Sequence, residues 1–259
     1  KYTLRCIINS CNEAITGAFD NPEDVPQLLD SVETAVLAIR ENSEVNRAVT
    51  VKSAVRDVME HFAALVSDEK KSQGFMMGYE VLDRMSGGLK PGEMFIIAAR
   101  PSMGKTSFMM NIVEHICIDQ QRPAMVFSCE MTTFQIVQRL IFSRARYKFS
   151  DLSKGLKPQK KDLLSIKRAS EEISNAKLFI DDTASITIND LRAKARRKKR
   201  DEDIQLIAID YLQLMRSLSK QAANSREREI AEISSGLKAL AKELNIPVIV
   251  LAQLNRGPE

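Results

Sequence analysis

The fold of this protein is indicated by one stretch of sequence, Met94-Phe95-Ile96-Ile97-Ala98-Ala99-Arg100-Pro101-Ser102-Met103-Gly104-Lys105-Thr106. An apolar run of strand length comes first, a short polar loop follows, and a helix-length segment continues to about residue 120. The loop has the spacing of a phosphate-binding loop, although Ala99 stands where the simplest pattern has glycine. Strand, loop and helix in this order predict a P-loop unit of an α/β protein.

Each residue type in the loop suits the phosphates of a nucleotide. Gly104 lets the backbone approach closely, and Lys105 neutralises charge on the terminal phosphates. Thr106 offers its hydroxyl to Mg²⁺, which makes it a predicted metal ligand. The loop and the first turn of its helix are the predicted nucleotide-binding residues: Arg100, Pro101, Ser102, Met103, Gly104, Lys105, Thr106 and Ser107.

The segment from residue 74 onward alternates short apolar runs with helix-length stretches. This rhythm is typical of a parallel sheet flanked by helices, with right-handed crossovers between strands. Thr187-Ile188-Asn189-Asp190 resembles a capping box that opens the helix before the fourth strand. The predicted strands are 94–99, 124–128, 178–181, 205–210 and 247–253.

Three polar side chains stand at or just after the ends of predicted strands, at the edge where open α/β sheets bind ligands. Asp210 ends an apolar strand and is the predicted acid of the Mg²⁺ site, although apolar strands often end in Asp. Glu130 is the candidate general base for a water molecule; the alternative is an acid that starts the next helix. Gln253 is suited to sensing the γ-phosphate.

The N-terminal part of the sequence predicts a small all-α segment. Apolar residues recur at helical spacing in 4–15 and 25–39, and Thr50 is a candidate cap for a third helix over 51–66. The apolar face of this third helix needs a partner, either in its own domain or elsewhere. We divide the chain into residues 1–47, a linker helix and linker at 48–73, and an ATPase-type domain at 74–259.

Composition excludes several classes of protein. With 44% hydrophobic and 28% charged residues, the 259-residue chain is neither disordered nor collagenous. A net charge of +4 does not by itself indicate nucleic-acid binding. Four cysteines without a CxxC pair, beside two histidines, exclude a zinc site and favour a reduced, cytoplasmic setting. The apolar runs are shorter than the roughly 20 residues that cross a membrane, so we expect no membrane partner.

Five motifs together resemble the replicative DNA helicases of the DnaB family. The resemblance covers nearly all of 74–259, and the preceding helices are similar, more loosely, to the end of that family's N-terminal domain and its linker helix. The motifs are Gly87-Gly88-Leu89-Lys90-Pro91-Gly92-Glu93, Ala99 to Thr106, Ser128-Cys129-Glu130-Met131, Ile209-Asp210-Tyr211-Leu212-Gln213-Leu214 and Leu251-Ala252-Gln253-Leu254-Asn255-Arg256.

The resemblance implies a function and a set of partners. Members of this family are ring hexamers with a RecA-like core, which hydrolyse ATP with Mg²⁺ between subunits and move 5′ to 3′ along single-stranded DNA. Primase and a helicase loader are the implied protein partners. By position, Lys105, Glu130, Asp210 and Gln253 are the implied catalytic set. The family continues into strands that carry an arginine finger, so we expect this sequence to be incomplete at its C-terminus.

Two alternatives remain open from the sequence. One is a RecA-type ATPase that does not unwind DNA, and the other is a docking scaffold. For DNA contact the candidates are Lys220, Arg226 and Arg228 in the polar segment 216–228, although such a loop is more often merely solvated. The basic run of 194–200 is interpreted as a solvated helix end, because no aromatic residues interleave with it.

Overall fold

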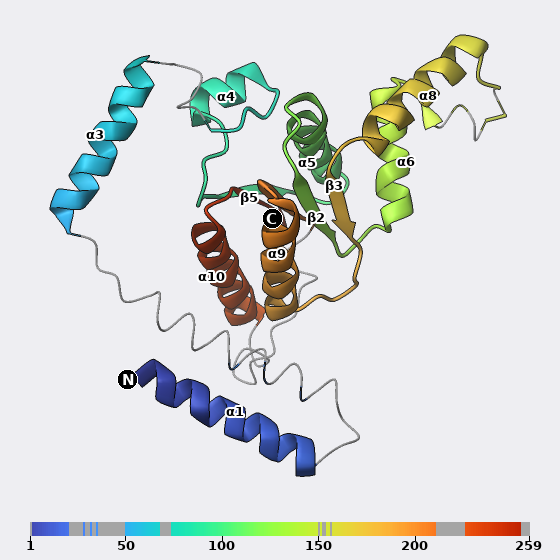
Figure 1. Cartoon of the computed structure of the whole chain (residues 1–259). Coiled ribbons are helices and arrows are strands. Elements are labelled where there is room, and N and C mark those ends of the chain that lie inside the picture. Colours follow the sequence, from blue (N-terminus) through green and yellow to red (C-terminus); the bar gives the residue numbers. More distant parts are fainter. Residues whose placement is uncertain are drawn as a thin grey trace, which may run out of the picture. The chain divides into compact units, whose positions relative to one another are not determined.

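The computed structural model describes residues 2–20, 28, 32, 35, 50–67, 74–149, 151, 154–155, 157–210 and 226–254. The chain divides into two compact units, Lys1–Lys71 and Ser72–Glu259. Helices alone occur in the described part of the first unit, whereas the second contains the sheet (Figure 1). The predicted helix over 25–39 lies outside the described residues, apart from the helical positions Leu28, Val32 and Ala35.

The first unit contains the predicted amphipathic helices α1 (Tyr2–Asp20) and α3 (Val51–Ser67). Thr50 caps α3 as predicted, because its Oγ1 accepts a hydrogen bond from the Ser53 N–H at 3.3 Å. The apolar side chains of α3 are largely exposed; among them Val51 is 79% and Phe62 56% exposed. Across the described ranges, no helix combines the length and apolar character that a membrane crossing requires.

The second unit is built on a five-stranded parallel sheet, as the sequence predicts. Every strand begins and ends within one residue of its predicted bounds. The order across the sheet is β1-β5-β4-β2-β3, so the α/β, RecA-like prediction is confirmed. The strands are β1 (Met94–Ala99), β2 (Ala124–Ser128), β3 (Leu178–Asp181), β4 (Leu206–Asp210) and β5 (Val248–Gln253).

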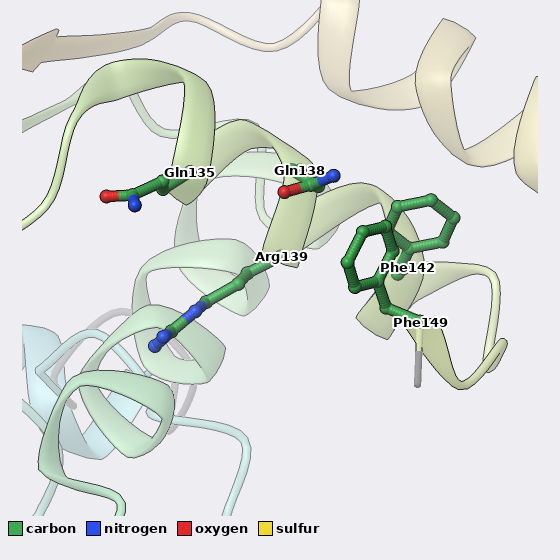
Figure 2. A pocket seen from close by; sticks show the side chains of 5 residues that line it. All are labelled: Gln135, Gln138, Arg139, Phe142 and Phe149. Atoms are coloured by element: carbon green, nitrogen blue, oxygen red, sulfur yellow. The ribbon is translucent and has the colours of Figure 1, made fainter. Parts of the chain in front are cut away.

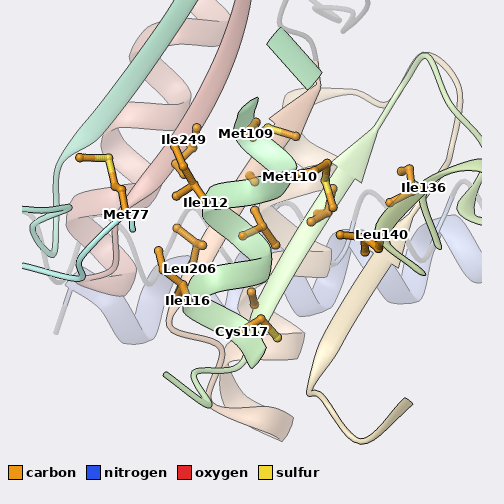
Figure 3. Close-up of a cluster of buried hydrophobic side chains, with 14 of the residues drawn as sticks. Met77, Met109, Met110, Ile112, Ile116, Cys117, Ile136, Leu140, Leu206 and Ile249 are labelled. Atoms are coloured by element: carbon orange, nitrogen blue, oxygen red, sulfur yellow. The ribbon is translucent and has the colours of Figure 1, made fainter. Parts of the chain in front are cut away.

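Helices cover both faces of this sheet. Alternate residues of each strand point to opposite faces, and apolar side chains on both faces need to be buried. In β4, Leu206 and Ala208 join one core cluster, whereas Ile207 and Ile209 join the other. Figure 3 shows the first cluster, in which α5 (Lys105–Glu114) lies against the sheet together with η1 (His115–Asp119) and α6 (Thr133–Arg144). The helix α8 (Lys160–Ser174) packs beside α6, and the short α4 (Glu80–Ser86) precedes β1.

The second core cluster lies under α9 (Ile188–Glu202) and α10 (Arg226–Leu244). Thr187 is the N-cap of α9 as predicted: its Oγ1 accepts from the Asp190 N–H at 3.2 Å. One detail of the prediction is wrong, because Arg226 and Arg228 belong to α10 and not to the preceding loop. Glu227 and Glu229 occupy the first turn of α10, where acids stabilise a helix N-terminus.

One guanidinium ties the helices on the α5 face together. Arg144, at the end of α6, lies within 3.3 Å of Glu114, 2.8 Å of Asp119 and 2.8 Å of Glu172. Hydrogen bonds from Arg144 and Arg168 hold the pKa of Glu172 below its usual range. Burial acts to raise the pKa of Asp119, but hydrogen bonds from Arg144 and His115 outweigh it and lower that pKa. The cluster therefore joins α5, η1, α6 and α8.

We expect Arg144→Met to lower the free energy of unfolding at pH 7 by about 1–3 kcal/mol, since three carboxylates lose their shared partner. The lowered pKa values of Asp119 and Glu172 contribute stability above their unfolded pKa values, and this contribution is lost as pH falls through the folded ones. The difference between the two proteins should thus shrink below about pH 4. Urea unfolding measures it, with Arg168→Met as control, since Arg168 is 83% exposed. Equal losses for both variants would contradict the prediction.

Candidate functional site

The loop after β1 ends in a backbone geometry that favours glycine. Gly104, the N-cap of α5, has φ 84° and ψ 20°, in the left-handed region, and no side chain caps this helix end. The N–H groups of the first turn are therefore directed out of the helix toward the loop. Residues 100–104 of the loop are exposed, and Lys105 and Thr106 are half-buried. The predicted phosphate loop thus forms an open end of α5 with a positive local field.

The sheet order brings Thr106 to Asp210, 104 residues later in the chain. After β1 the chain passes over β5 and β4 through α5, which contacts both strands, before it enters β2. The start of α5 accordingly lies at the end of β4, where the Thr106 Oγ1–H donates to Asp210 Oδ2 at 2.7 Å. Asp210 is only 1% exposed. Its Oδ1 is buried and has no hydrogen-bond partner among the described residues.

Burial makes the charged form of the Asp210 carboxyl energetically unfavourable. Burial raises the pKa of its carboxyl above the ordinary value, and the nearby charge of Glu130 raises it further. The Thr106 hydrogen bond and the charges of Lys105 and Arg139 act in the opposite direction. A buried carboxylate with one unpartnered oxygen is a group that a divalent cation would stabilise.

The other predicted side chains lie at the same edge of the sheet. Ser128 pairs with Asp210 in the register, and Glu130 follows two residues later as an exposed side chain. Gln253 pairs with Ala99 at the end of β5. The Lys105 ammonium reaches the carbonyl of Ala99 at 3.5 Å, the outer limit of a hydrogen bond. The parallel sheet thus collects at one edge the four predicted residues Lys105, Glu130, Asp210 and Gln253, which are well separated in the sequence.

The sequence of the second unit shows which family the chain belongs to. Residues 74–259 match the model of the DnaB-like helicase C-terminal domain. This chain belongs to that family. The predicted resemblance is therefore confirmed, and it covers the whole P-loop unit.

Curated relatives support the same assignment over the whole chain. A replicative DNA helicase DnaB of Geobacillus stearothermophilus is 33% identical over 260 residues, which is 100% of this chain and 57% of that protein. The DnaB of Haemophilus influenzae is 37% identical over 269 residues and is covered to 56%. The chain therefore spans somewhat more than half the length of each of these two relatives.

Solved structures of related proteins share the fold. A solved ATPase domain superposes with a TM-score of 0.73 at 30% identity, over 81% of this chain and 73% of that one. A DnaB-like replicative helicase, solved in a study of its interactions with primase, gives 0.70 at 27% identity, over 98% of this chain and 59% of that one. The DnaB-like fold therefore extends over the sheet, its helices and the edge at which the predicted site residues lie.

The residues at the edge of this DnaB-like domain fit Mg²⁺. A hydroxyl and a carboxylate meet at 2.7 Å, and the orphaned Oδ1 of Asp210 supplies a free acceptor. Oxygen donors of this kind are what Mg²⁺ prefers, usually through retained water molecules. The donor set is compatible with the metal that a bound nucleotide would bring.

Sequence reasoning missed Arg139, whose charge acts on Asp210 from α6. The residue also lines a cavity of about 320 Å³ with Gln135, Gln138, Phe142 and Phe149. In Figure 2 the Arg139 side chain extends away from the two phenylalanine rings, toward neighbouring helices. A single arginine in the middle of an amphipathic helix has no motif of its own, so only the packing of α6 places its charge near the site.

The candidate DNA contacts are only partly described. Lys220 lies outside the described residues, Arg226 starts α10, and the side chain of Arg228 is exposed. The basic run of α9 is largely neutralised, because five of its members lie within 4.0 Å of an acid and Lys198 lies over the Phe179 ring. This agrees with a solvated, ion-paired helix end and does not favour DNA binding there.

Proposed function

We propose that this chain is the ATPase core of a replicative DNA helicase, which unwinds duplex DNA 5′ to 3′ by hydrolysing ATP. The observation that carries the proposal is the 2.7 Å hydrogen bond from Thr106, in the phosphate loop, to the buried Asp210 in a DnaB-like domain. The DnaB relatives give no support to the RecA-type ATPase without unwinding activity or to the docking scaffold.

The loop holds the nucleotide in this proposal. The backbone N–H groups of residue 100 and of residues 102–107 surround the phosphates, and the Lys105 ammonium offsets charge on the terminal two. Thr106 and Asp210 would hold Mg²⁺, directly or through water. Mg²⁺ held by these residues would supply positive charge to offset the negative charge that develops on the phosphates during transfer. These roles use the open start of α5 and the free oxygen of Asp210.

Glu130 acts as the general base in this proposal. It takes a proton from a water molecule, whose oxygen attacks the γ-phosphorus. The bond from that phosphorus to the β–γ bridging oxygen breaks, which leaves ADP and inorganic phosphate. An exposed carboxylate at the edge of the sheet, near Asp210, supports this role. Gln253, at the end of the neighbouring strand β5, would sense the γ-phosphate and pass its loss to the segment that follows.

The proposal is tested by steady-state ATP hydrolysis of the 259-residue chain, with and without single-stranded DNA. We expect turnover that DNA stimulates and that requires Mg²⁺. Binding of ATP without any turnover would contradict an active core within these residues. Turnover that DNA does not affect would remove the helicase part of the proposal, and Lys220, Arg226 and Arg228 would lose their candidacy as contacts.

We propose that the protein works as a homohexameric ring in which α3 docks on a neighbouring copy. Val51, Val55, Val58, Met59 and Phe62 form an exposed apolar face on this helix. Such a face is typical of a helix that is buried in an assembly. One solved relative is described with its interactions with primase. By analogy, primase and a helicase loader are proposed partners of this chain.

We expect Phe62→Ala to weaken ring assembly, since truncation of a buried aromatic side chain typically costs about 3–5 kcal/mol. Light scattering over a concentration series measures the change as a shift to smaller species. The control is Glu60→Ala on the polar side of α3, where the side chain pairs with Arg56 at 3.9 Å. An assembly that Phe62→Ala leaves unchanged would mean that α3 packs within its own subunit.

A further inference from the structure

The proposed base lies on a turn that one buried hydroxyl closes. Ser128 is the last residue of β2 and is 1% exposed. Its Oγ–H donates to the carbonyl of Met131 at 2.7 Å, and the same oxygen accepts from the Met131 N–H at 3.1 Å. Cys129 and Glu130 are the two residues between these partners. The two hydrogen bonds therefore fix the turn that carries the Glu130 carboxylate.

Backbone contacts hold this turn on both sides. The Cys129 N–H donates to the Asp210 carbonyl at 2.7 Å, which joins the turn to the end of β4. After the turn, the Thr133 N–H donates to Asp182 Oδ2 at 2.8 Å. Thr132 and Gln135 form a capping box that starts α6. Glu130 is thus an exposed side chain on a backbone that is fixed against β4 and α6.

A hydroxyl is an unusual choice at the position of Ser128. Among the described residues, Ser128 and Asp210 are the polar or charged side chains classed as buried; the rest of the buried core is apolar. An alanine would fill nearly the same space without the need for a partner, so the hydroxyl requires a specific explanation. Both of its partners belong to Met131, immediately after Glu130.

We infer that Ser128 is a positioning residue for Glu130, and that its hydroxyl sets the orientation of the carboxylate toward the attacking water. This inference rests on the proposed function. It goes beyond that function because Ser128 is not among the residues proposed to hold nucleotide or metal, and both hydrogen bonds of its hydroxyl go to the turn. Misplacement of a reacting group by about 1 Å lowers rates by about 100-fold, so loss of both hydrogen bonds has a measurable effect.

The test is a double-mutant cycle in ATP hydrolysis by the chain. Ser128→Ala should lower kcat about 10-fold or more and leave KM within about twofold, because nucleotide binding does not use the turn. In the Glu130→Gln background the same substitution should cause no further loss, since the two residues act as a unit. Ser165→Ala is the control: that hydroxyl donates to Lys161 O at 3.1 Å on α8 and should leave kcat unchanged.

Amide hydrogen exchange at Met131 measures whether the turn is held, independently of the rate of ATP hydrolysis. Faster exchange in Ser128→Ala with a lower kcat supports the inference, whereas faster exchange with kcat within about threefold of the parent overturns it. Unchanged exchange also overturns it, whatever the turnover, because the hydroxyl then does not hold the turn. If Glu130→Gln itself hydrolyses ATP normally, the proposed role of Glu130 fails, and this result is distinct from a failure confined to Ser128.

Discussion

Lys105→Ala will lower the rate of ATP hydrolysis by about 10²–10³-fold, the range observed when one preorganised charge or donor is removed from a transition state. Lys105 is the first residue of α5, and its ammonium reaches back to the carbonyl of Ala99 at the end of β1. The ammonium is thus held over the loop where the terminal phosphates would lie. An alanine at this position leaves the backbone N–H groups in place but removes the positive charge.

The loss should appear in kcat and in nucleotide affinity, because the proposed role of Lys105 is to contact the phosphates in the ground state as well as in the transition state. A coupled phosphate-release assay measures the first quantity, and titration with a fluorescent ATP analogue measures the second. The matched control is Lys167→Ala, which removes a 76% exposed lysine from α8. Near-normal turnover in Lys105→Ala would show that the loop after β1 is not the phosphate site.

Glu130→Gln should reduce hydrolysis to a small residual rate while ATP remains bound. The amide keeps the size of the side chain and its place on the turn, but it cannot accept the proton of the attacking water. General-base catalysis typically contributes about 10²–10⁴-fold, so kcat should fall within that range. The charge of Glu130 also raises the pKa of Asp210, so its removal makes Asp210 easier to ionise and should not weaken the Mg²⁺ site.

Binding of ATP by Glu130→Gln should therefore equal or exceed that of the parent chain. Titration with a fluorescent ATP analogue measures this binding. Rapid quench of a single turnover measures the rate of the chemical step separately from product release. Glu93→Gln is the matched control, because Glu93 is an exposed acid immediately before β1, at the opposite edge of the sheet. Hydrolysis that persists in Glu130→Gln would show that another acid is the base, and it would remove the basis for a positioning role of Ser128.

Much of the fold of the second unit could be predicted because its elements are locally encoded. The strand β2 is five apolar or small residues that are all buried, between a proline and a turn. Thr187 and Thr50 cap helices through contacts that span three residues. The predicted loop over 216–228 was a harder case. Alternating Arg and Glu at 226–229 suit both a solvated loop and the first turn of a helix, and acids at a helix start favour the helix.

The candidate site was predictable only in its parts. Gly104, Lys105 and Thr106 form a local motif, and the spacing of that motif specifies its chemistry. Roles for Asp210 and Glu130 could be predicted because the carboxyl ends of parallel strands meet at the same edge of a sheet, where ligands bind. Arg139 belongs to no local motif, and the motif that begins with Ser128 indicates a role for Glu130 but none for the serine itself. The role of an arginine within a helix can be inferred only when its neighbours in space are known. The same holds for a serine at the end of a strand.

By itself, the sequence determined the strands, two helix caps, the phosphate-loop motif and the membership of the DnaB-like family, because each depends on residues close together in the chain. The tertiary structure alone decided the strand order, and with it the 2.7 Å contact between Thr106 and Asp210. It also decided that Arg144 joins three acids and that Ser128 closes the turn of Glu130. The physical reason is that hydrogen bonds and charges act over a few ångströms, and packing brings residues that are distant in the chain within that range.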